Sequence, residues 1–324
     1  MPEKTFREII NSNPGPGNVK DSFKLFLKGL AMGAADIVPG VSGGTIALIT
    51  GIYGQLIDAI RSFNTDLIRD IFRLRFKDAL SKFHFKFIFV LFTGIGISIL
   101  LLSRLINHLL IHHQPYIYSL FFGLIASSIF VLYRDINKKN ISVMINFIIG
   151  TVFSYFLVGA VPATTPETYT FIFFSGFIAI MAMILPGISG AFILLLLGKY
   201  EFITGTLKNP FNPGNFVIII IFCIGCASGL AAFARFLKWL IENYRCTTLA
   251  VLTGFMAGSL RKIWPWKEVL EKEVIGSREF IISEINIIPE FSAEGLFVQI
   301  LIMLTGVIAV LLLNSSAGDT GSRK

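Results

Sequence analysis

Five long apolar segments, each close to the length of a membrane-spanning helix, constrain the fold of this chain more than any other feature. They cover residues 85–102, 141–161, 171–197, 216–233 and 296–313. A helix needs about 20 mostly apolar residues to cross the hydrocarbon core of a bilayer, and a soluble fold needs no such series. Because 54% of the residues are hydrophobic and only 15% are charged, the sequence predicts an all-α polytopic membrane protein.

The basic residues are distributed unevenly over the polar segments between these runs. If each apolar hairpin returns to its own side, most of the 28 Lys and Arg residues fall on one side of the membrane, in 1–28, 61–86, 134–140, 235–245 and the C-terminal tail. Basic loops stay cytoplasmic, so both termini are expected inside. The net charge of +8 then reflects topology and attraction to anionic membrane lipids, and nucleic acid is not an expected partner. The polar, basic N-terminus shows no cleavable signal peptide.

An internal repeat organises the chain. Residues 38–60 and 185–207 align without a gap at a shift of 147 positions, and residues 92–128 align more weakly with 223–259 at a shift of 131. The identical pairs of the first block are Pro39/Pro186, Gly40/Gly187, Ser42/Ser189, Gly43/Gly190, Ile46/Ile193, Leu48/Leu195, Gly51/Gly198 and Tyr53/Tyr200. One apolar segment separates the two copies, so the second copy is predicted to be inverted in the membrane. Inverted repeats are typical of secondary transporters.

The predicted regions follow from this repeat. Repeat 1 spans 23–136 and repeat 2 spans 169–266. Each repeat is expected to hold a broken, re-entrant helical hairpin (23–60 and 169–207) and two transmembrane helices (85–107 and 116–133; 215–241 and 246–263). A basic amphipathic insert, 61–84, is expected on the cytoplasmic surface. The other regions are a cytoplasmic N-terminal segment (1–22), a linking transmembrane helix (141–161), an extracytoplasmic loop (267–295) and a C-terminal transmembrane helix (296–313).

Two Pro-Gly-x-Ser-Gly motifs, at 39–43 and 186–190, form the candidate site. Proline removes a backbone donor and glycine frees the backbone, so a helix must break at each motif, and Ser42 and Ser189 are good N-cap residues for the next helix. Irregular backbone persists at membrane depth only where it is buried in protein or lines a cavity. We expect the two corners to meet near the midplane, where their amides and the Ser42, Thr45 and Ser189 hydroxyls would bind an anion. The alternative is that the glycines only permit close helix packing.

Three charged residues complete the predicted site. Arg104 and Arg235 are repeat-equivalent and lie near the ends of spans, where they would receive a phosphate at opposite faces or simply extend to the interface. Asp36 would carry a proton or cation, or would hydrogen-bond the turn amides. The predicted substrate-binding residues are Asp36, Pro39, Gly40, Ser42, Gly43, Gly44, Thr45, Arg104, Pro186, Gly187, Ser189, Gly190 and Arg235.

No catalytic residue, metal site or cofactor is expected. Cys223 and Cys226 form a CxxC pair, but they lie in an apolar helix without partner cysteines or a nearby pair of histidines. Metal or redox chemistry needs such partners. The two cysteines are therefore interpreted as small helix-packing residues.

The stretches GAADIVPGVSGGTIALITGIYGQLI and ILPGISGAFILLLLGKYEFI resemble the bacterial polyprenyl-phosphate transporter family, long known as a membrane domain of unknown function. The resemblance covers roughly residues 20–312. It implies a flippase, not an enzyme, that returns undecaprenyl phosphate across the bacterial cytoplasmic membrane by alternating access, for reuse in cell-envelope synthesis. The implied partner is the polyprenyl-phosphate lipid, and a homodimer is left open.

Membrane undecaprenyl-pyrophosphate phosphatases are the main alternative, because they also combine inverted repeats with a Pro-Gly-x-Ser-Arg-Ser corner. Here Gly190 stands where their catalytic arginine would be, Ala191 follows it, and Asp36 stands alone where they carry a pair of glutamates. Without that arginine and those carboxylates, stabilisation of transition-state charge has no obvious source. A transporter or channel for another anion is the second alternative.

Overall fold

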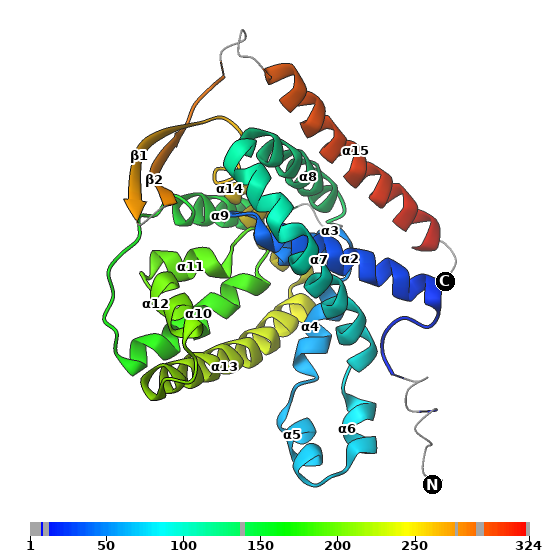
Figure 1. Ribbon diagram of the computed structural model, residues 1–324. Coiled ribbons are helices and arrows are strands. Elements are labelled where there is room, and N and C mark those ends of the chain that lie inside the picture. Colours follow the sequence, from blue (N-terminus) through cyan, green and yellow to red (C-terminus); the bar gives the residue numbers. More distant parts are fainter. Residues whose placement is uncertain (1–7, 9–12, 137–139, 276–277, 290–294, 322–324) are drawn as a thin grey trace.

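The computed structural model describes residues 8, 13–136, 140–275, 278–289 and 295–321, which are mainly helical (Figure 1). The first half contains α2 (Val19–Ile37), α3 (Gly43–Ile49), α4 (Tyr53–Arg61), α5 (Thr65–Phe72), α6 (Phe76–Lys82), α7 (Phe85–His112), α8 (Gln114–Arg134) and α9 (Ile141–Leu157). The second half contains α10 (Tyr169–Ile184), α11 (Gly190–Leu196), α12 (Tyr200–Lys208), α13 (Pro213–Asn243), α14 (Arg245–Ser259), β1 (Lys267–Ile275), β2 (Arg278–Asn286) and α15 (Leu296–Gly321).

Helices related by the internal repeat have matching bounds. The short helices α3 and α11 begin 147 positions apart, at Gly43 and Gly190, and α4 and α12 begin with the same separation, at Tyr53 and Tyr200. The two short helices of each repeat are bent by 120° in the first copy and 108° in the second. In addition, α2 packs against α7 as α10 packs against α13. One architecture therefore occurs twice, and its inversion across the membrane stays a prediction.

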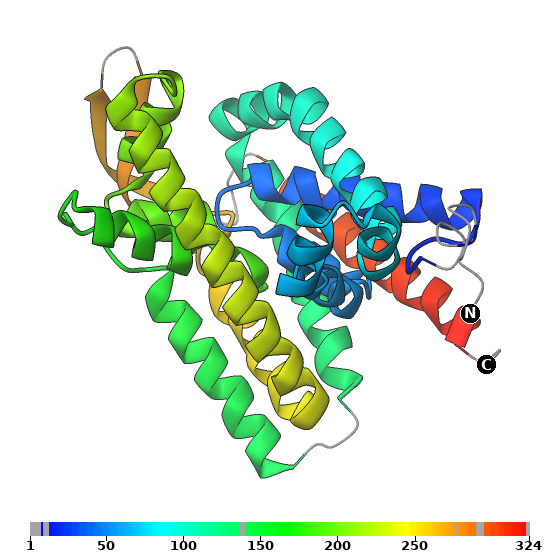
Figure 2. The same ribbon diagram turned by 90° about the horizontal axis from the view of Figure 1, so that it is seen from below.

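The helices that follow the two repeats are exchanged between them. Helix α9 follows the first repeat but packs along α14 of the second, whereas α15 follows the second repeat and packs along α8 of the first. Both contacts are close because they are made at glycines: Gly150 lies against the backbone of Val251, and Gly306 lies against the backbone of Leu120. Figure 2 shows α9 and α13 on one side of the molecule and α2 and α15 on the other. The exchange links the two sides.

Several helices are suited to a bilayer. By length and composition α7, α8 and α13 can each cross a membrane, and the bent pairs α3–α4 and α11–α12 pass the same test only as pairs. Helices α9 and α10 and the part Leu296–Leu312 of α15 are shorter apolar helices; with 17 residues, α9 is at the lower end of the spanning range. Large apolar side chains such as Phe89 and Leu100 are exposed on the outer surface. The chain is a multi-pass membrane protein.

The region 267–295 departs from the predicted all-α fold, whereas its extracytoplasmic placement stays a prediction. Instead, β1 and β2 pair as an antiparallel hairpin, while residues 276–277 and 290–294 lie outside the described part of the chain. The run Lys-Glu-Val-Leu-Glu-Lys-Glu-Val-Ile of β1 mixes β-branched and charged residues without a helical period, which favours a strand. The base of the hairpin is fixed by the indole N–H of Trp264, which donates to the Ile287 carbonyl at 2.9 Å.

The insert at 61–84 forms a helical hairpin of α5 and α6. It projects from the molecule on the side opposite the β-hairpin (Figure 1). Lys82 pairs with Asp70 at 2.6 Å, and the Asn13 amide donates to the carbonyls of Leu80 and Phe83 at 2.9 and 2.6 Å. The insert is therefore tied to the segment that precedes α2, and its cytoplasmic placement stays a prediction.

Candidate functional site

The two Pro-Gly-x-Ser-Gly motifs lie in direct contact. We name residues 36–45 the first corner and residues 183–192 the second corner. The Thr45 hydroxyl accepts a hydrogen bond from the backbone N–H of Gly187 at 2.8 Å, across 142 residues of sequence. A Cβ atom placed on Gly44 would lie only 2.6 Å from the carbonyl oxygen of Ile184. The corners are thus packed backbone against backbone, as expected if the repeats meet there.

The first repeat supplies most of the polar side chains of this contact, from Ser42 and Thr45 of the first corner and from Tyr53 of α4. The hydroxyl of Ser42 donates to the carbonyls of Met183 and Leu185, both at 3.4 Å, and the buried Tyr53 hydroxyl donates to the Ile184 carbonyl at 3.1 Å. These bonds satisfy carbonyls that the break after α10 leaves without helical partners. The Tyr53 bond contributes about 1 kcal/mol to stability, whereas the two longer Ser42 contacts share one hydroxyl hydrogen. Hydroxyls of the first repeat thus contact the backbone of the second.

The predicted breaks and caps occur in both repeats. Gly40 and Gly187 adopt φ values of +88° and +83°, a region that costs other residues about 1–2 kcal/mol. Ser42 caps α3 by accepting from the N–H of Gly44 at 3.1 Å, and Ser189 caps α11 through the N–H of Phe192 at 3.5 Å. The helix breaks that the sequence predicts are therefore confirmed.

The Gly43 amide, a predicted anion donor of the first corner, is already bonded within the protein. The N–H of Gly43 donates to the Asp36 carboxylate at 2.6 Å, so Asp36 bonds the turn amide, one of the roles expected for it. Asp36 is nevertheless exposed. At the second corner, a Cβ on Gly190 would meet the Ala179 carbonyl oxygen at 2.6 Å, which gives Gly190 a packing role. An anion that binds here must exchange with protein groups.

Arg104 and Arg235 lie on α7 and α13, and both are exposed. Arg235 donates to the carbonyl of Ala231, one turn earlier in its own helix, at 3.0 Å. Among the contacts of the described residues, none joins either arginine to a corner. The structure therefore brings the two motifs together but does not bring the arginines to them.

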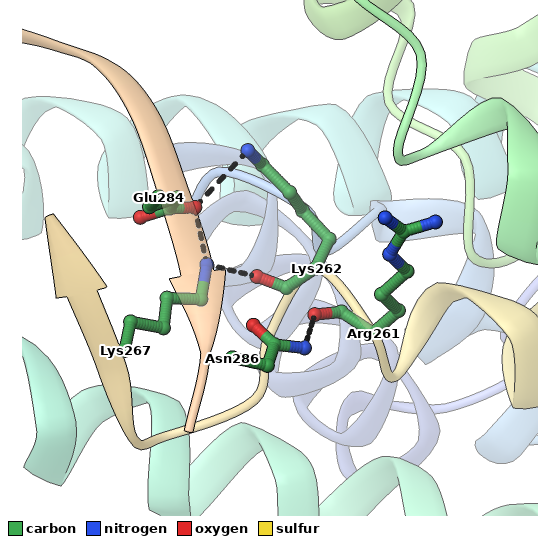
Figure 3. A network of polar contacts seen from close by, with 5 residues as sticks. All are labelled: Arg261, Lys262, Lys267, Glu284 and Asn286. Atoms are coloured by element: carbon green, nitrogen blue, oxygen red, sulfur yellow. Dashed lines mark hydrogen bonds and ion pairs between the residues drawn. The ribbon is translucent and has the colours of Figure 1, made fainter. Parts of the chain in front are cut away.

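Sequence reasoning missed Lys262, which follows α14 and touches both corners. Its Cγ lies 2.7 Å from the position of a Cβ on Gly40, and its ammonium lies 5.6 Å from the centre of the Phe192 ring. Figure 3 shows this ammonium directed toward Glu284 of β2, which also pairs with Lys267. The only signal in the sequence was the basic pair Arg261-Lys262 at the end of the predicted span 246–263.

Glu284 is held as a carboxylate in this cluster. Burial acts to raise the pKa of Glu284, but the ammonium groups of Lys267 and Lys262 outweigh it and hold the pKa below its usual value. Asn286 of the same strand donates to the Arg261 carbonyl at 2.8 Å. The β-hairpin is thereby docked on the turn after α14.

A second basic feature lies at the opposite end of α3. A cavity of about 310 Å³ is lined by Lys24 and Lys28 of α2, by the Gly51 turn and by Gln55. The Lys28 ammonium donates to the Thr50 carbonyl at 2.7 Å, a favourable place for a cation because it is a helix C-terminus. Charged lysines thus flank the first corner at both ends of its short helix.

The cysteines show no sign of a metal site. Cys223 and Cys226 are free thiols on α13, and the sulfur of Cys226 lies 3.1 Å from the position of a Cβ on Gly176 of α10. Within the described ranges, no group of three or more His, Cys, Asp or Glu side chains is arranged to hold a metal ion.

Comparison with known proteins connects this geometry to a family. A family profile described as undecaprenyl phosphate translocase-like matches residues 32–280, a range that includes both corners and Lys262. A protein of Vibrio cholerae serotype O1 named polyprenyl-phosphate transporter is 43% identical over 303 residues, which cover 91% of this chain and 97% of that protein. A protein of the same name from Staphylococcus aureus is 32% identical over 254 residues, 74% of this chain and 85% of the relative.

No solved structure matches the chain. The relatives are named as transporters and not as enzymes, and the resemblance seen in the two motifs is confirmed. The chain belongs to the undecaprenyl phosphate translocase-like family.

Proposed function

We propose that this protein carries polyprenyl phosphate across a membrane and that the two joined corners hold the phosphate during transfer. The observation that carries the proposal is the direct contact of the two repeat-related corners, with Thr45 bonded to the Gly187 amide, in a chain whose relatives are named polyprenyl-phosphate transporters. A carrier needs a site at the interface of its repeats that can open to either side. Many apolar side chains exposed on the helices suit the passage of an isoprenoid tail through lipid.

Binding at the corners requires the internal hydrogen bonds to be exchanged. The phosphate would take the Gly43 amide from Asp36 and the Gly187 amide from Thr45, while the hydroxyls of Ser42, Thr45 and Ser189 donate to phosphate oxygens. The proposed substrate-binding set is thus the one given by the sequence. Because the bonds are replaced rather than lost, the bound and free states can be close in free energy.

The proposed direction is from the outer to the inner leaflet of the bacterial cytoplasmic membrane, which returns undecaprenyl phosphate for reuse. In this cycle Arg104 and Arg235 receive the phosphate at opposite faces. Both are exposed on long helices, as a receiving group must be. The insert α5–α6, where Phe72 is exposed among basic residues such as Arg73 and Arg75, would rest on anionic lipid at the cytoplasmic face. A homodimer is compatible with this arrangement.

Topology can be tested by cysteine labelling in a background that lacks the native cysteines. Lys138 lies outside the described residues, so we choose Ser142, at the start of α9, and Thr164, after its end; both are exposed. Ser142→Cys should react with an impermeant maleimide only from the cytoplasm, and Thr164→Cys only from outside. Reaction of both from the same side would rule out the crossing by α9 and with it the inversion.

Transport can be tested with purified protein in vesicles that contain a fluorescent short-chain polyprenyl phosphate. The protein should accelerate movement of this lipid between leaflets, measured by quenching of the exposed leaflet, but not movement of a phosphatidylcholine with the same fluorophore. Glu201→Gln, an exposed change on α12, serves as a control that should transport normally. Equal acceleration of both lipids would indicate a non-selective leak and contradict the proposal.

The phosphatase alternative makes a different prediction for vesicles that contain undecaprenyl pyrophosphate in place of the fluorescent lipid. A phosphatase would release inorganic phosphate from undecaprenyl pyrophosphate. The carrier should release none above the level of protein-free vesicles, because Gly190 and Asp36 replace the charged groups that such chemistry needs.

A further inference from the structure

Three charged side chains, Lys262, Lys267 and Glu284, form one cluster (Figure 3), and Lys262 connects it to the joined corners. A single carboxylate oxygen of Glu284 pairs with both ammonium groups, with that of Lys262 at 3.2 Å and with that of Lys267 at closer range. The three side chains are largely buried: 27% of Lys262, 6% of Lys267 and 17% of Glu284 is exposed. Two cations therefore share one anion in a place with little water.

The two lysines are held to different degrees. Lys267 also donates to the Lys262 carbonyl at 2.8 Å and lies 5.0 Å from the centre of the Tyr118 ring. The Lys262 ammonium has Glu284 as its single hydrogen-bond acceptor among the described residues, at the longer distance. Lys262 is therefore the cation that can change partners at small cost.

Lys262 is also the cation in contact with the corners. Its side chain passes the Gly40 turn of the first corner and reaches the Phe192 ring of the second. A phosphate bound to this ammonium would thus arrive directly at the backbone that we propose as the transfer site.

Glu284 is not the only group that docks the hairpin. Asn286 bonds to the Arg261 carbonyl, Trp264 bonds to the Ile287 carbonyl, and the Ile287 amide donates to the Trp266 carbonyl at 3.0 Å. Directly beside Glu284 the register of the two strands shifts, between Val269 and Glu271. Such irregularities re-aim individual side chains while the rest of the ladder persists.

We propose that Lys262 and Lys267 form a binding site for the phosphate of the lipid, and that Glu284 occupies this site until the phosphate displaces it. A phosphomonoester carries up to two negative charges and three terminal oxygens, so it satisfies two ammonium groups better than one carboxylate oxygen does. The proposal rests on the proposed function and adds to it a competition between a glutamate of the chain and the substrate.

Competition has a signature that a purely structural ion cluster does not share. Glu284→Gln keeps the size of the side chain but removes the charge, so it should tighten binding of the phosphate several-fold. Lys262→Gln should weaken binding about tenfold or more, because it removes a charge-assisted hydrogen bond. If the cluster only held the hairpin in place, both substitutions would loosen the same structure and neither would improve binding.

The test uses the purified full chain, farnesyl phosphate as the probe and farnesol as the probe without phosphate, with binding measured by microscale thermophoresis. Glu201→Gln and Lys208→Gln, both exposed in the described part of α12, are the matched controls and should bind as wild type does. Lys262→Arg, which keeps the charge, should bind close to wild type. Lys262→Met, which also lacks the charge, should weaken binding and replaces Lys262→Gln if that variant does not fold.

Tighter binding by Glu284→Gln together with weaker binding by Lys262→Gln supports the proposal. If the wild type prefers farnesyl phosphate to farnesol but Glu284→Gln binds equally well or less well, the competition is wrong and the proposed function stands. If the wild type shows no preference for farnesyl phosphate, the proposed function fails and the lysine site fails with it.

Discussion

The first corner and the second corner have similar backbone conformations, but their side chains make different contacts. Thr45 is fully buried and bonded to the second corner, whereas its counterpart in the repeat is the apolar Phe192. Tyr53 is 3% exposed and donates to the Ile184 carbonyl, whereas its counterpart Tyr200 is 42% exposed. The first copy carries the polar side chains that join the repeats, and the second copy supplies mainly backbone acceptors and the Gly187 amide.

This asymmetry means that the polar side chains of one repeat form the hydrogen bonds that join both repeats. A carrier with two equivalent corners could lose a hydroxyl from either one with the same effect. Here the side chains that bond to the second corner, Ser42, Thr45 and Tyr53, all belong to the first repeat. Substitutions at equivalent positions should therefore have unequal effects, larger in the first corner.

The largest expected effect comes from the pair Gly44 and Ala191, which the repeat makes equivalent. A Cβ on Gly44 would overlap the Ile184 carbonyl oxygen, whereas Ala191 already carries a Cβ and is exposed. Gly44→Val should separate the corners, cost more than about 3 kcal/mol and abolish transport, while Ala191→Val should be nearly neutral. Thermal unfolding in detergent and the vesicle assay measure both. Equal tolerance at the two positions would contradict the contact between corners.

A smaller loss is expected from the Thr45 hydroxyl. Thr45→Val keeps the shape of the side chain but leaves the buried Gly187 amide without an acceptor, which costs about 1–3 kcal/mol. Thr45→Ser keeps the acceptor and should retain most of the stability and transport. Denaturation midpoints compared with those of Phe192→Leu, which alters packing at the repeat-equivalent position without removing a hydrogen bond, show whether the hydroxyl or the packing matters. A Thr45→Val variant as stable as Thr45→Ser would show that the bond between the corners contributes nothing.

The third prediction separates the charge of Asp36 from its hydrogen bond to Gly43. Asp36→Asn keeps an acceptor for the amide, so it should cost about 1 kcal/mol or less and should transport at a rate near that of wild type. Asp36→Ala leaves the amide without its acceptor and should transport more slowly. Met183 occupies the equivalent position in the second repeat. Met183→Leu is therefore a control that should transport at the wild-type rate. If Asp36→Asn folded normally but did not transport, the charge itself would be required, as for a proton or cation carrier.

The smallest effect is expected at Arg104 and Arg235. Lysine keeps the charge but loses the planar pair of donors, so each Arg→Lys variant should slow transport modestly without changing insertion. Arg104→Lys should weaken uptake from the outer leaflet, and Arg235→Lys should slow release inside. Rates measured in vesicles of known orientation distinguish the two defects. Transport at the wild-type rate by both variants would mean that these arginines only extend to the interface.

The sequence predicted those parts of the fold that depend on local backbone chemistry. Proline and glycine at 39–40 and 186–187 determine where the helices break, and Ser42 and Ser189 cap the helices that follow; such signals act within a few residues of the chain. The repeat then indicated that the two breaks belong together.

Long-range partners could not be predicted in the same way. Lys262 and Glu284 are 22 residues apart, and they pair only because the β-hairpin folds back onto the turn after α14. The exchange of α9 and α15 between the repeats depends on which glycine-containing helix surfaces fit together, and apolar runs of similar composition do not reveal that. The predicted amide donors are likewise bonded to Asp36 and Thr45, which only the assembled corners show.

The most direct test of the central claim is an experimental map of the protein with a short-chain polyprenyl phosphate bound in a lipid nanodisc. The account predicts phosphate density between the first and second corners or at Lys262, within hydrogen-bonding distance of Thr45, the Gly187 amide or the Lys262 ammonium, with Glu284 turned away. Phosphate density confined to the outer ends of α7 and α13, with the Thr45–Gly187 and Lys262–Glu284 contacts intact, would contradict it.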